Sequence, residues 1–385
     1  MGSQPVRRGI DWHTAQRVGE LLAGSSSLGG PPAKAPCELA HDFARRVGEY
    51  TGLELPEELP ALEMVDRPAW IAANLLTMRP VLDQAIERLV GADEDGDVGG
   101  NGKSHWSERT PGILYGPLRA ASDTASGSLR AASGHLLGAQ LGAVTGILSQ
   151  RVLGQYDVSL IGPPVAPRLL LLEPNLAAAA HNLGVDRGEL TAWVAIHEIT
   201  HAVQFAGAPW LRGHLGGLLE ELLAGLQLAS ENDFGALLGR ARKGDLDLGK
   251  LIERARQGEL LRLGLGEERW ELIEQMQAVM SLIEGHAEHT MDAVGAGVLP
   301  SLPELRAALS RRRASRGLPW RVLEKLLGLE LKMRQYEVGR RFCDAVVKEG
   351  GPQALMTAWR SPEDLPSAAE LNEPGLWLTR VLLAA

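Results

Sequence analysis

Helical periodicity runs through most of the chain and limits its fold more than any other feature of the sequence. From Asp186 to Glu349, apolar residues recur at intervals of three and four, the spacing that lines one face of an α-helix. The predicted helices of this half cover residues 186–206, 211–229, 246–263, 267–293, 301–310 and 320–349. Further helices are predicted at residues 12–23, 37–52 and 66–90.

Strand signals are sparse. Arg168 to Glu173 forms a short apolar run between Pro167 and Pro174, which is typical of a buried strand. The sequence therefore predicts a mainly α (α+β) fold with few short strands and an N-terminal helical region.

The apolar segment from Ala131 to Leu148 contains four glycines at a spacing of four, namely Gly134, Gly138, Gly142 and Gly146. On a helix this spacing places the glycines in one stripe, where another backbone can approach closely. A histidine and a glutamine interrupt the segment, and a membrane span needs about twenty mostly apolar residues. We therefore interpret it as a buried helix and not as a membrane span.

Composition excludes several classes of protein. With 45% hydrophobic and 23% charged residues, the chain has the composition of a globular protein and not of a disordered one. A net charge of −9 means that the chain has no overall basic character that would favour nucleic acid or an anionic membrane. Cys37 and Cys343 are the only cysteines, which excludes a disulfide-stapled fold. Because no apolar segment follows the N-terminal arginines, we expect no signal peptide and a cytoplasmic location.

One motif carries chemistry. His197-Glu198-Ile199-Thr200-His201 matches the H-E-x-x-H pattern, and Asp186 with Glu189 resembles a capping box that starts a helix before it. Within a helix, residues i and i+4 share a face about 5–6 Å apart, so both imidazoles can reach one ion. Two histidines and one carboxylate leave the fourth position of a tetrahedral Zn²⁺ open for water. Glu198 is then placed to take a proton from that water and to deliver one to the leaving group.

Two glutamates compete for the place of the third ligand. Glu221 lies twenty residues after His201, a spacing used by some zinc enzymes with this motif, but it also fits the polar face of an amphipathic helix. Glu284 shares a predicted helix face with Glu288, which could accept the remaining N–H of a ligand histidine. Glu221 has Gly225 in the equivalent place, so we favour Glu284 as the ligand with Glu288 beside it.

Other polar residues could complete the site, and the sequence does not select among them. His286 and His289 are alternative metal ligands. A metal hydrolase also needs a hydrogen-bond donor for the developing oxyanion, and the candidates are Tyr336, Arg340, His181 and His214.

Stretches distributed over most of the chain resemble the zincin-like hydrolase family of actinobacteria and some other bacteria, one branch of which is labelled as associated with deazaflavin coenzyme biosynthesis. The resemblance implies a mainly helical zincin-like fold with both motif histidines on the active-site helix, and it favours Glu284 as ligand. Glu288 departs from the family pattern, in which aspartate is expected. The matching stretches are Val65–Trp70 with Ala73-Asn74, Ser149–Asp157, His197–Phe205, Pro209–Arg212, Leu282–Asp292, Lys332 with Gln335-Tyr336, and Ser361–Pro366.

These features together predict a zinc-dependent hydrolase of the H-E-x-x-H (zincin) type, resembling a metallopeptidase and acting on a peptide or amide bond. The substrate is expected to lie along Arg168 to Glu173 as an edge strand. We predict an N-terminal helical region over residues 1–120 and a metal-binding domain over residues 121–385. Two alternatives stay open: a helical binding or scaffold protein whose structural or vestigial metal site is closed by a fourth protein ligand, and a metallohydrolase for a small metabolite.

Overall fold

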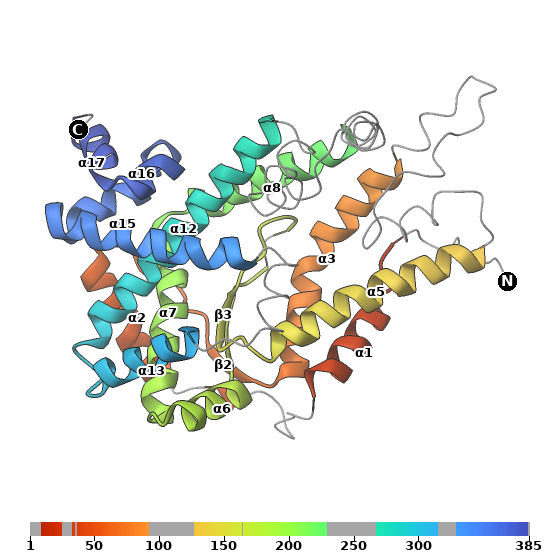
Figure 1. Ribbon diagram of the computed structural model, residues 1–385, viewed down its shortest axis with the longest axis horizontal. Helices are drawn as coiled ribbons and strands as arrows, with labels where there is room; N and C mark the ends of the chain where they lie inside the picture. Colours follow the sequence, from red (N-terminus) through yellow and green to blue (C-terminus); the bar gives the residue numbers. More distant parts are fainter. Residues whose placement is uncertain are drawn as a thin grey trace, which may run out of the picture. The chain divides into compact units, whose positions relative to one another are not determined.

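The computed structural model describes residues 9–24, 33–34, 37–91, 127–163, 165–228, 267–314 and 329–383 (Figure 1). These residues form a mainly helical chain with a few short strands, as predicted. The chain folds into two compact units of three segments each. The first unit contains Met1–Gly24, Ile71–Ile147 and Gly217–Ile273, and the second contains Ser25–Trp70, Leu148–Gly216 and Glu274–Ala385.

The domain boundary that we predict at residue 120 lies outside the described residues. Helix α1 (Trp12–Ala23), which precedes it, belongs to the first unit, whereas α2 (Cys37–Thr51) belongs to the second. The segment before residue 120 therefore contributes elements to both units.

A small mixed sheet lies in the second unit. Its four strands are β1 (Ala33–Lys34), β2 (Leu62–Val65), β3 (Gly154–Asp157) and β4 (Arg168–Leu172), in the order β1-β2-β4-β3. Strands β2 and β4 run parallel, with Leu62 opposite Leu169, and β3 runs antiparallel to β4, with Gly154 opposite Leu171. The apolar run after Pro167 thus forms a strand as predicted. Our expectation that it is an edge strand is wrong, because β4 is paired on both sides and β3 is the edge.

The core of the second unit forms where helices cover this sheet. Helix α7 (Arg187–Gly207) packs against β3, β4 and α2. Leu169 and Leu171 of β4 are fully buried in the same apolar cluster as Ile196 and Ile199 of α7. Because α7 is apolar on most sides, burial against both the sheet and α2 fixes its position.

The glycine stripe predicted from the sequence is a helix contact within the first unit. The stripe lies on α5 (Gly127–Ser149), which runs beside α1 (Figure 1). A Cβ atom added at Gly138 or Gly142 would collide with the backbone carbonyl oxygen of Asp11 or Ala15, respectively. Only glycine permits this close approach. Among the helices described, none has the length and apolar character needed to span a bilayer.

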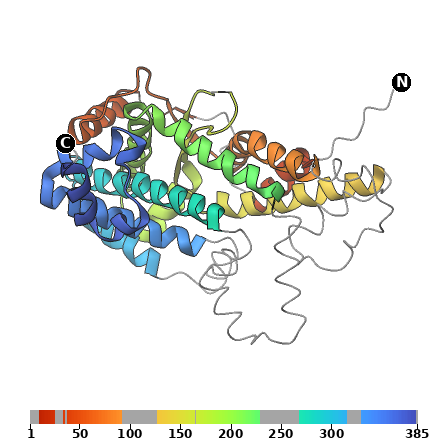
Figure 2. The same ribbon diagram turned by 90° about the horizontal axis from the view of Figure 1, so that it is seen from above.

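A second close helix crossing lies in the second unit, between α12 (Glu267–Gly295) and α15 (Leu329–Met356) (Figures 1 and 2). A Cβ atom at Gly285 would collide with the backbone of Gly339, and one at Gly339 would collide with the carbonyl oxygen of Ser281. The crossing therefore brings α15 against the turn of α12 that carries Glu284.

The other predicted helices form with small shifts at their ends. They are α3 (Arg67–Gly91), α8 (Trp210–Leu228) and α13 (Leu302–Ala314), with α6 (Glu173–Leu183) in addition. The helix predicted at residues 246–263 and the first part of the one predicted at 320–349 lie outside the described residues. Two 3₁₀ turns and two short helices end the chain: Thr357–Trp359, Pro362–Asp364, α16 (Ala368–Asn372) and α17 (Pro374–Leu383).

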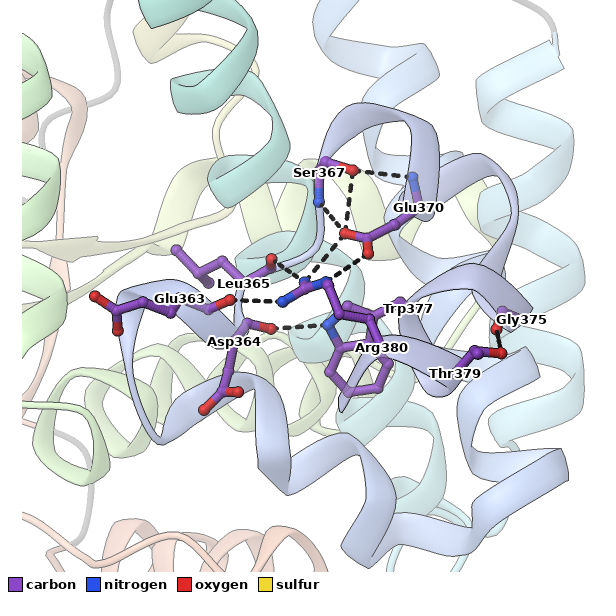
Figure 3. Close-up of polar contacts among 9 residues, drawn as sticks. All are labelled: Glu363, Asp364, Leu365, Ser367, Glu370, Gly375, Trp377, Thr379 and Arg380. Atoms are coloured by element: carbon purple, nitrogen blue, oxygen red, sulfur yellow. Dashed lines mark hydrogen bonds and ion pairs between the residues drawn. The ribbon is translucent and has the colours of Figure 1, made fainter. Parts of the chain in front are cut away.

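Polar contacts hold these C-terminal turns together (Figure 3). The guanidinium of Arg380 donates hydrogen bonds to the carbonyl oxygens of Glu363 and Leu365 and to the carboxylate of Glu370. Nε1 of Trp377 donates to the carbonyl oxygen of Asp364 at 2.7 Å. Side chains of α17 thereby satisfy backbone carbonyl groups of the Ser361–Pro366 stretch, one of those that resembles the zincin-like family.

Candidate metal centre

The H-E-x-x-H motif lies in the middle of α7, as its sequence context predicts. The Asp186 side chain caps the helix by accepting a hydrogen bond from the backbone N–H of Glu189 at 2.8 Å. The reciprocal half of a capping box is not formed, since the Glu189 carboxylate accepts from the backbone N–H of Ser301 instead. Ten residues, almost three turns, separate the first helical residue, Arg187, from His197, so the motif histidines lie where the helix is regular.

Three metal-binding donors converge at this point. Nε2 of His197 and Nε2 of His201 are 3.2 Å apart. Oε2 of Glu284, from α12, lies 3.4 Å from the first nitrogen and 3.7 Å from the second. In the part of the chain that the structure describes, these are the residues that cluster as a candidate metal site.

The size of this triangle suits a single zinc ion. Zinc binds nitrogen and oxygen at about 2.0–2.2 Å, so two ligands of a tetrahedral ion lie about 3.3–3.6 Å apart. The three edges agree with that span to within about 0.1 Å. The side chains of His197 and Glu284 are 19% and 20% exposed, so one side of the triangle is reached from solvent. Two imidazoles and one carboxylate are also the donor set of many catalytic zinc sites.

The other ligand candidates have different surroundings. Glu221 is exposed on α8 and is not part of the cluster. His289 is hydrogen-bonded through Nε2 to the hydroxyl of Tyr50 at 2.7 Å and through Nδ1 to Asp344 at 2.6 Å. His286 is buried and its Nδ1 atom lies 2.8 Å from the side-chain nitrogen of Gln204. The structure thus brings Glu284 to the motif histidines, whereas His286 and His289 have other partners.

The hydrogen bond that orients His201 comes from a residue that we did not single out in the sequence. Oε1 of Gln204 lies 2.9 Å from Nδ1 of His201. Nδ1 of His197 is buried and has no hydrogen-bond partner among the described residues. Glu288 is buried close to His197. Its hydrogen bond to the N–H of a ligand histidine stays a prediction.

The pKa values of the two motif histidines are shifted in opposite directions. Burial disfavours the imidazolium form of His197, but the hydrogen bond to Glu284 and the charges of Glu198, Glu284 and Glu288 outweigh burial and raise its pKa to about 9. Burial, together with the charge on His197, lowers the pKa of His201. At neutral pH and without a metal ion, the pair therefore carries one positive charge, on His197.

Glu198 points into the same site without joining the triangle. Burial, reinforced by repulsion from Glu284, raises its pKa to about 7, although His197 and a hydrogen bond from the backbone N–H of Tyr156 act in the opposite direction. Strand β3 supports the carboxylate closely, since a Cβ atom at Gly154 would lie 2.7 Å from Oε1 of Glu198. A buried carboxyl group that titrates near neutrality is suited to general acid–base catalysis.

The candidates for an oxyanion donor are placed less clearly. Nη2 of Arg340 forms an ion pair with Asp292 at 2.7 Å. His181 is exposed near the end of α6, and His214 lies edge-on to Trp210 on α8. Tyr336 belongs to the part of α15 whose side chains lie outside the description. Of the two histidines among these candidates, neither belongs to the cluster of described residues around His197, and we assign no oxyanion donor.

The site residues that sequence reasoning missed are Gln204 and Gly154. Gln204 lies three residues after His201 on the same helix, so helical geometry alone could have marked it as a neighbour. Gly154 lies in the Leu-Gly-Gln-Tyr-Asp stretch that resembles the zincin-like family. The sequence of that stretch does not reveal this role, because Gly154 contributes only its backbone, which lies close to the Glu198 carboxylate.

Comparison with known proteins gives a structural neighbour and a family. A crystal structure described as a proposed hydrolase with a novel fold, from Chloroflexus aurantiacus, is 27% identical, covers 96% of this chain and 98% of its own, and superposes with a TM-score of 0.60. No curated protein gives a match. The family model for zincin-like metallopeptidases matches residues 10–378. The chain therefore belongs to the zincin-like metallopeptidase family.

Proposed function

We propose that the chain is a zinc-dependent hydrolase that cleaves peptide or amide bonds. One observation carries the proposal: His197, His201 and Glu284 form a triangle of the size that zinc requires, and Glu198 lies beside it as a buried carboxyl group of raised pKa. A zincin-like metallopeptidase family and a hydrolase-like neighbour support the same class of reaction.

The residues of this chain would divide the work as follows. His197, His201 and Glu284 would hold a zinc ion, which would act as a Lewis acid and lower the pKa of a water molecule to about 7. Glu198 accepts the proton of that water on its carboxylate and then delivers it to the nitrogen of the leaving group. The backbone N–H of Tyr156 and the close backbone of Gly154 hold this carboxylate in place. Glu198 does not need to bind the metal for this task.

The scaffold alternative requires a fourth protein ligand on the metal. His286 and His289 were the candidates for it, and both have hydrogen-bond partners away from the triangle. Their placement therefore supports a catalytic metal site over a structural one. We further propose a cytoplasmic location, supported by the buried, unpaired thiol of Cys343.

The test is zinc content and turnover of the full-length protein. We expect about one zinc ion per chain and cleavage of members of a fluorogenic peptide library, lost on chelation and restored by added zinc. A zinc-loaded protein that cleaves neither peptides nor simple amides would remove the peptidase assignment, and cleavage confined to small amides would favour the metabolite alternative. Failure to bind zinc at micromolar concentration would remove the proposal as a whole.

A further inference from the structure

Gln204 of α7 makes three side-chain contacts, of which two reach α12. Its Oε1 atom lies 2.9 Å from Nδ1 of His201. Its Nε2 atom donates to the carbonyl oxygen of Ile283 at 2.9 Å and lies 2.8 Å from Nδ1 of His286. Gln204 is completely buried, and His201 and His286 are 6% and 2% exposed. Water therefore has little access to replace any of these contacts.

The direction of each hydrogen bond follows from the partners. A backbone carbonyl can only accept, so the amide NH₂ of Gln204 must face Ile283. The other end of the amide, Oε1, then faces His201 and can only accept as well. Nδ1 of His201 must carry the hydrogen. In a neutral imidazole the other nitrogen is then unprotonated, and Nε2 of His201 directs its lone pair toward His197 and Glu284.

His286 completes this arrangement. The amide of Gln204 has two hydrogens, of which Ile283 accepts one. Nδ1 of His286 is in place to accept the second, provided that this nitrogen is unprotonated. The ring of His286 packs edge-on against Trp359, with centroids 5.0 Å apart. Trp359 is in turn held through its carbonyl oxygen, which accepts a hydrogen bond from Nε1 of Trp210 at 3.1 Å.

We propose that Gln204 and His286 are positioning residues that hold His201 in the tautomer able to bind the metal through Nε2. The inference rests on the proposed function in one respect, since it takes His201 to be a ligand. It assigns to His286 a role different from metal ligation. In this role, Nδ1 of His286 reinforces the amide orientation that the carbonyl oxygen of Ile283 sets, with Oε1 of Gln204 toward His201.

Two matched pairs of variants test the proposal. Gln204→Met keeps the length of the side chain but replaces the amide oxygen by a thioether sulfur, which is only a weak acceptor for His201. His286→Leu removes the acceptor for Gln204, whereas His286→Asn replaces Nδ1 by an amide oxygen that can still accept. Zinc affinity is measured by competition with a chromophoric chelator, and the folded state of each metal-free variant is checked by urea unfolding.

We expect Gln204→Met to weaken zinc binding about 10- to 100-fold, the usual range when the partner of a ligand histidine is lost. His286→Leu is expected to weaken it about threefold to tenfold, and His286→Asn to restore affinity to within about twofold of the wild type. A purely structural role would predict equal destabilisation of folding without this rescue. Wild-type affinity in both Gln204→Met and His286→Leu would overturn the proposal.

A second measurement judges the proposal apart from zinc binding and apart from any variant. Long-range ¹⁵N–¹H NMR of the metal-free wild-type protein reports which nitrogen of each histidine carries the hydrogen. We expect His201 to be protonated at Nδ1 and His286 to be unprotonated at Nδ1. Protonation of His201 at Nε2 alone would overturn the proposal. If the wild type binds no zinc, the proposed function fails, and the tautomer of His201 still decides the role of Gln204.

Discussion

Gly154 lies directly against the carboxylate of Glu198. A Cβ atom at this glycine would stand 2.7 Å from Oε1 and 2.8 Å from Cγ of Glu198, and 2.7 Å from Cγ1 of Val194 one turn earlier. Glycine in a strand often marks such a close approach of another group. The edge strand β3 therefore sets how far the Glu198 side chain can extend on that side, and the position of the carboxylate depends on a residue with no side chain.

We expect Gly154→Ala to lower kcat at least about tenfold, because displacing a reacting group by a fraction of an ångström to 1 Å can cost up to about 100-fold. Zinc affinity should change little, since the contacts of the added methyl group are with Glu198 and Val194 and not with the three donors. Steady-state kinetics on the best library peptide, together with a zinc titration, measure both effects.

Gly213→Ala is the matched control for this variant. An added Cβ at Gly213, on α8, would meet no atom within 4 Å. Turnover and zinc affinity of Gly213→Ala should equal those of the wild type. If Gly154→Ala is as active as Gly213→Ala, the contact with Glu198 has no catalytic consequence.

The role of Glu198 itself predicts a separation of binding from turnover. Glu198→Gln keeps the size of the side chain but cannot accept a proton, so we expect kcat to fall about 10²- to 10⁴-fold. Because Glu198 is not one of the three donors, the variant should retain one zinc ion per chain. Metal analysis of the purified variant and its residual activity provide the check, and loss of zinc from Glu198→Gln would instead identify Glu198 as a ligand.

The choice between Glu284 and Glu221 as third ligand is open to a direct comparison. Glu284→Gln should weaken zinc binding by several orders of magnitude, since a neutral amide replaces the anionic ligand, whereas Glu221→Gln, an exposed site on α8, should bind zinc like the wild type. Both affinities can be measured in the same chelator competition. The reverse pattern would move the third ligand to Glu221.

Sequence reasoning predicted those features that depend on local spacing. The four-residue interval between His197 and His201 places both rings on one face of a helix, and Asp186 marks where that helix begins. The strand after Pro167 followed from its apolar run. In each case the physical cause acts over a few residues, so it is written in a short stretch of sequence.

Features that depend on tertiary contacts could not be predicted in the same way. The apolar run of β4 does not reveal whether the strand has a neighbour on one side or on both, and β4 is an interior strand. Gln204 contributes through Ile283 and His286 on a distant segment. Its role depends on how α7 and α12 pack, which no local pattern in the sequence specifies.

The crossing of α12 and α15 predicts a strong effect of a single methyl group. Gly339→Ala would force a Cβ atom into the carbonyl oxygen of Ser281, so α15 must move away from α12. Overpacking of this kind typically costs about 1–3 kcal/mol, and we expect a loss of stability in that range or above it. Urea unfolding measures it. Gly295→Ala is the control on α12, because its added Cβ would make only ordinary contacts at 3.4 Å or more.

Zinc binding should also release protons, in a number that depends on pH. A ligand histidine must be unprotonated to bind a metal, and His197 has a pKa of about 9 in the metal-free protein because of its carboxylate neighbours. Below pH 9 zinc must therefore displace this proton. The apparent zinc affinity should then fall about tenfold for each unit by which the pH is lowered. Burial already lowers the pKa of His201, so that residue contributes no proton at neutral pH.

Glu198 adds a second stage to this dependence. Its pKa is raised to about 7, and a nearby cation favours the ionised carboxylate. Between pH 7 and 9 the slope should correspond to one proton released, and below pH 7 it should steepen toward two; above pH 9 the dependence on these groups should disappear. Calorimetry in buffers of different ionisation enthalpy counts the protons directly. Glu198→Gln should keep the release of one proton between pH 7 and 9 and lose the release of the second proton below pH 7. A zinc affinity that is constant from pH 7 to 9 would contradict the prediction, because it would show that His197 is already unprotonated and that its contact with Glu284 holds no proton.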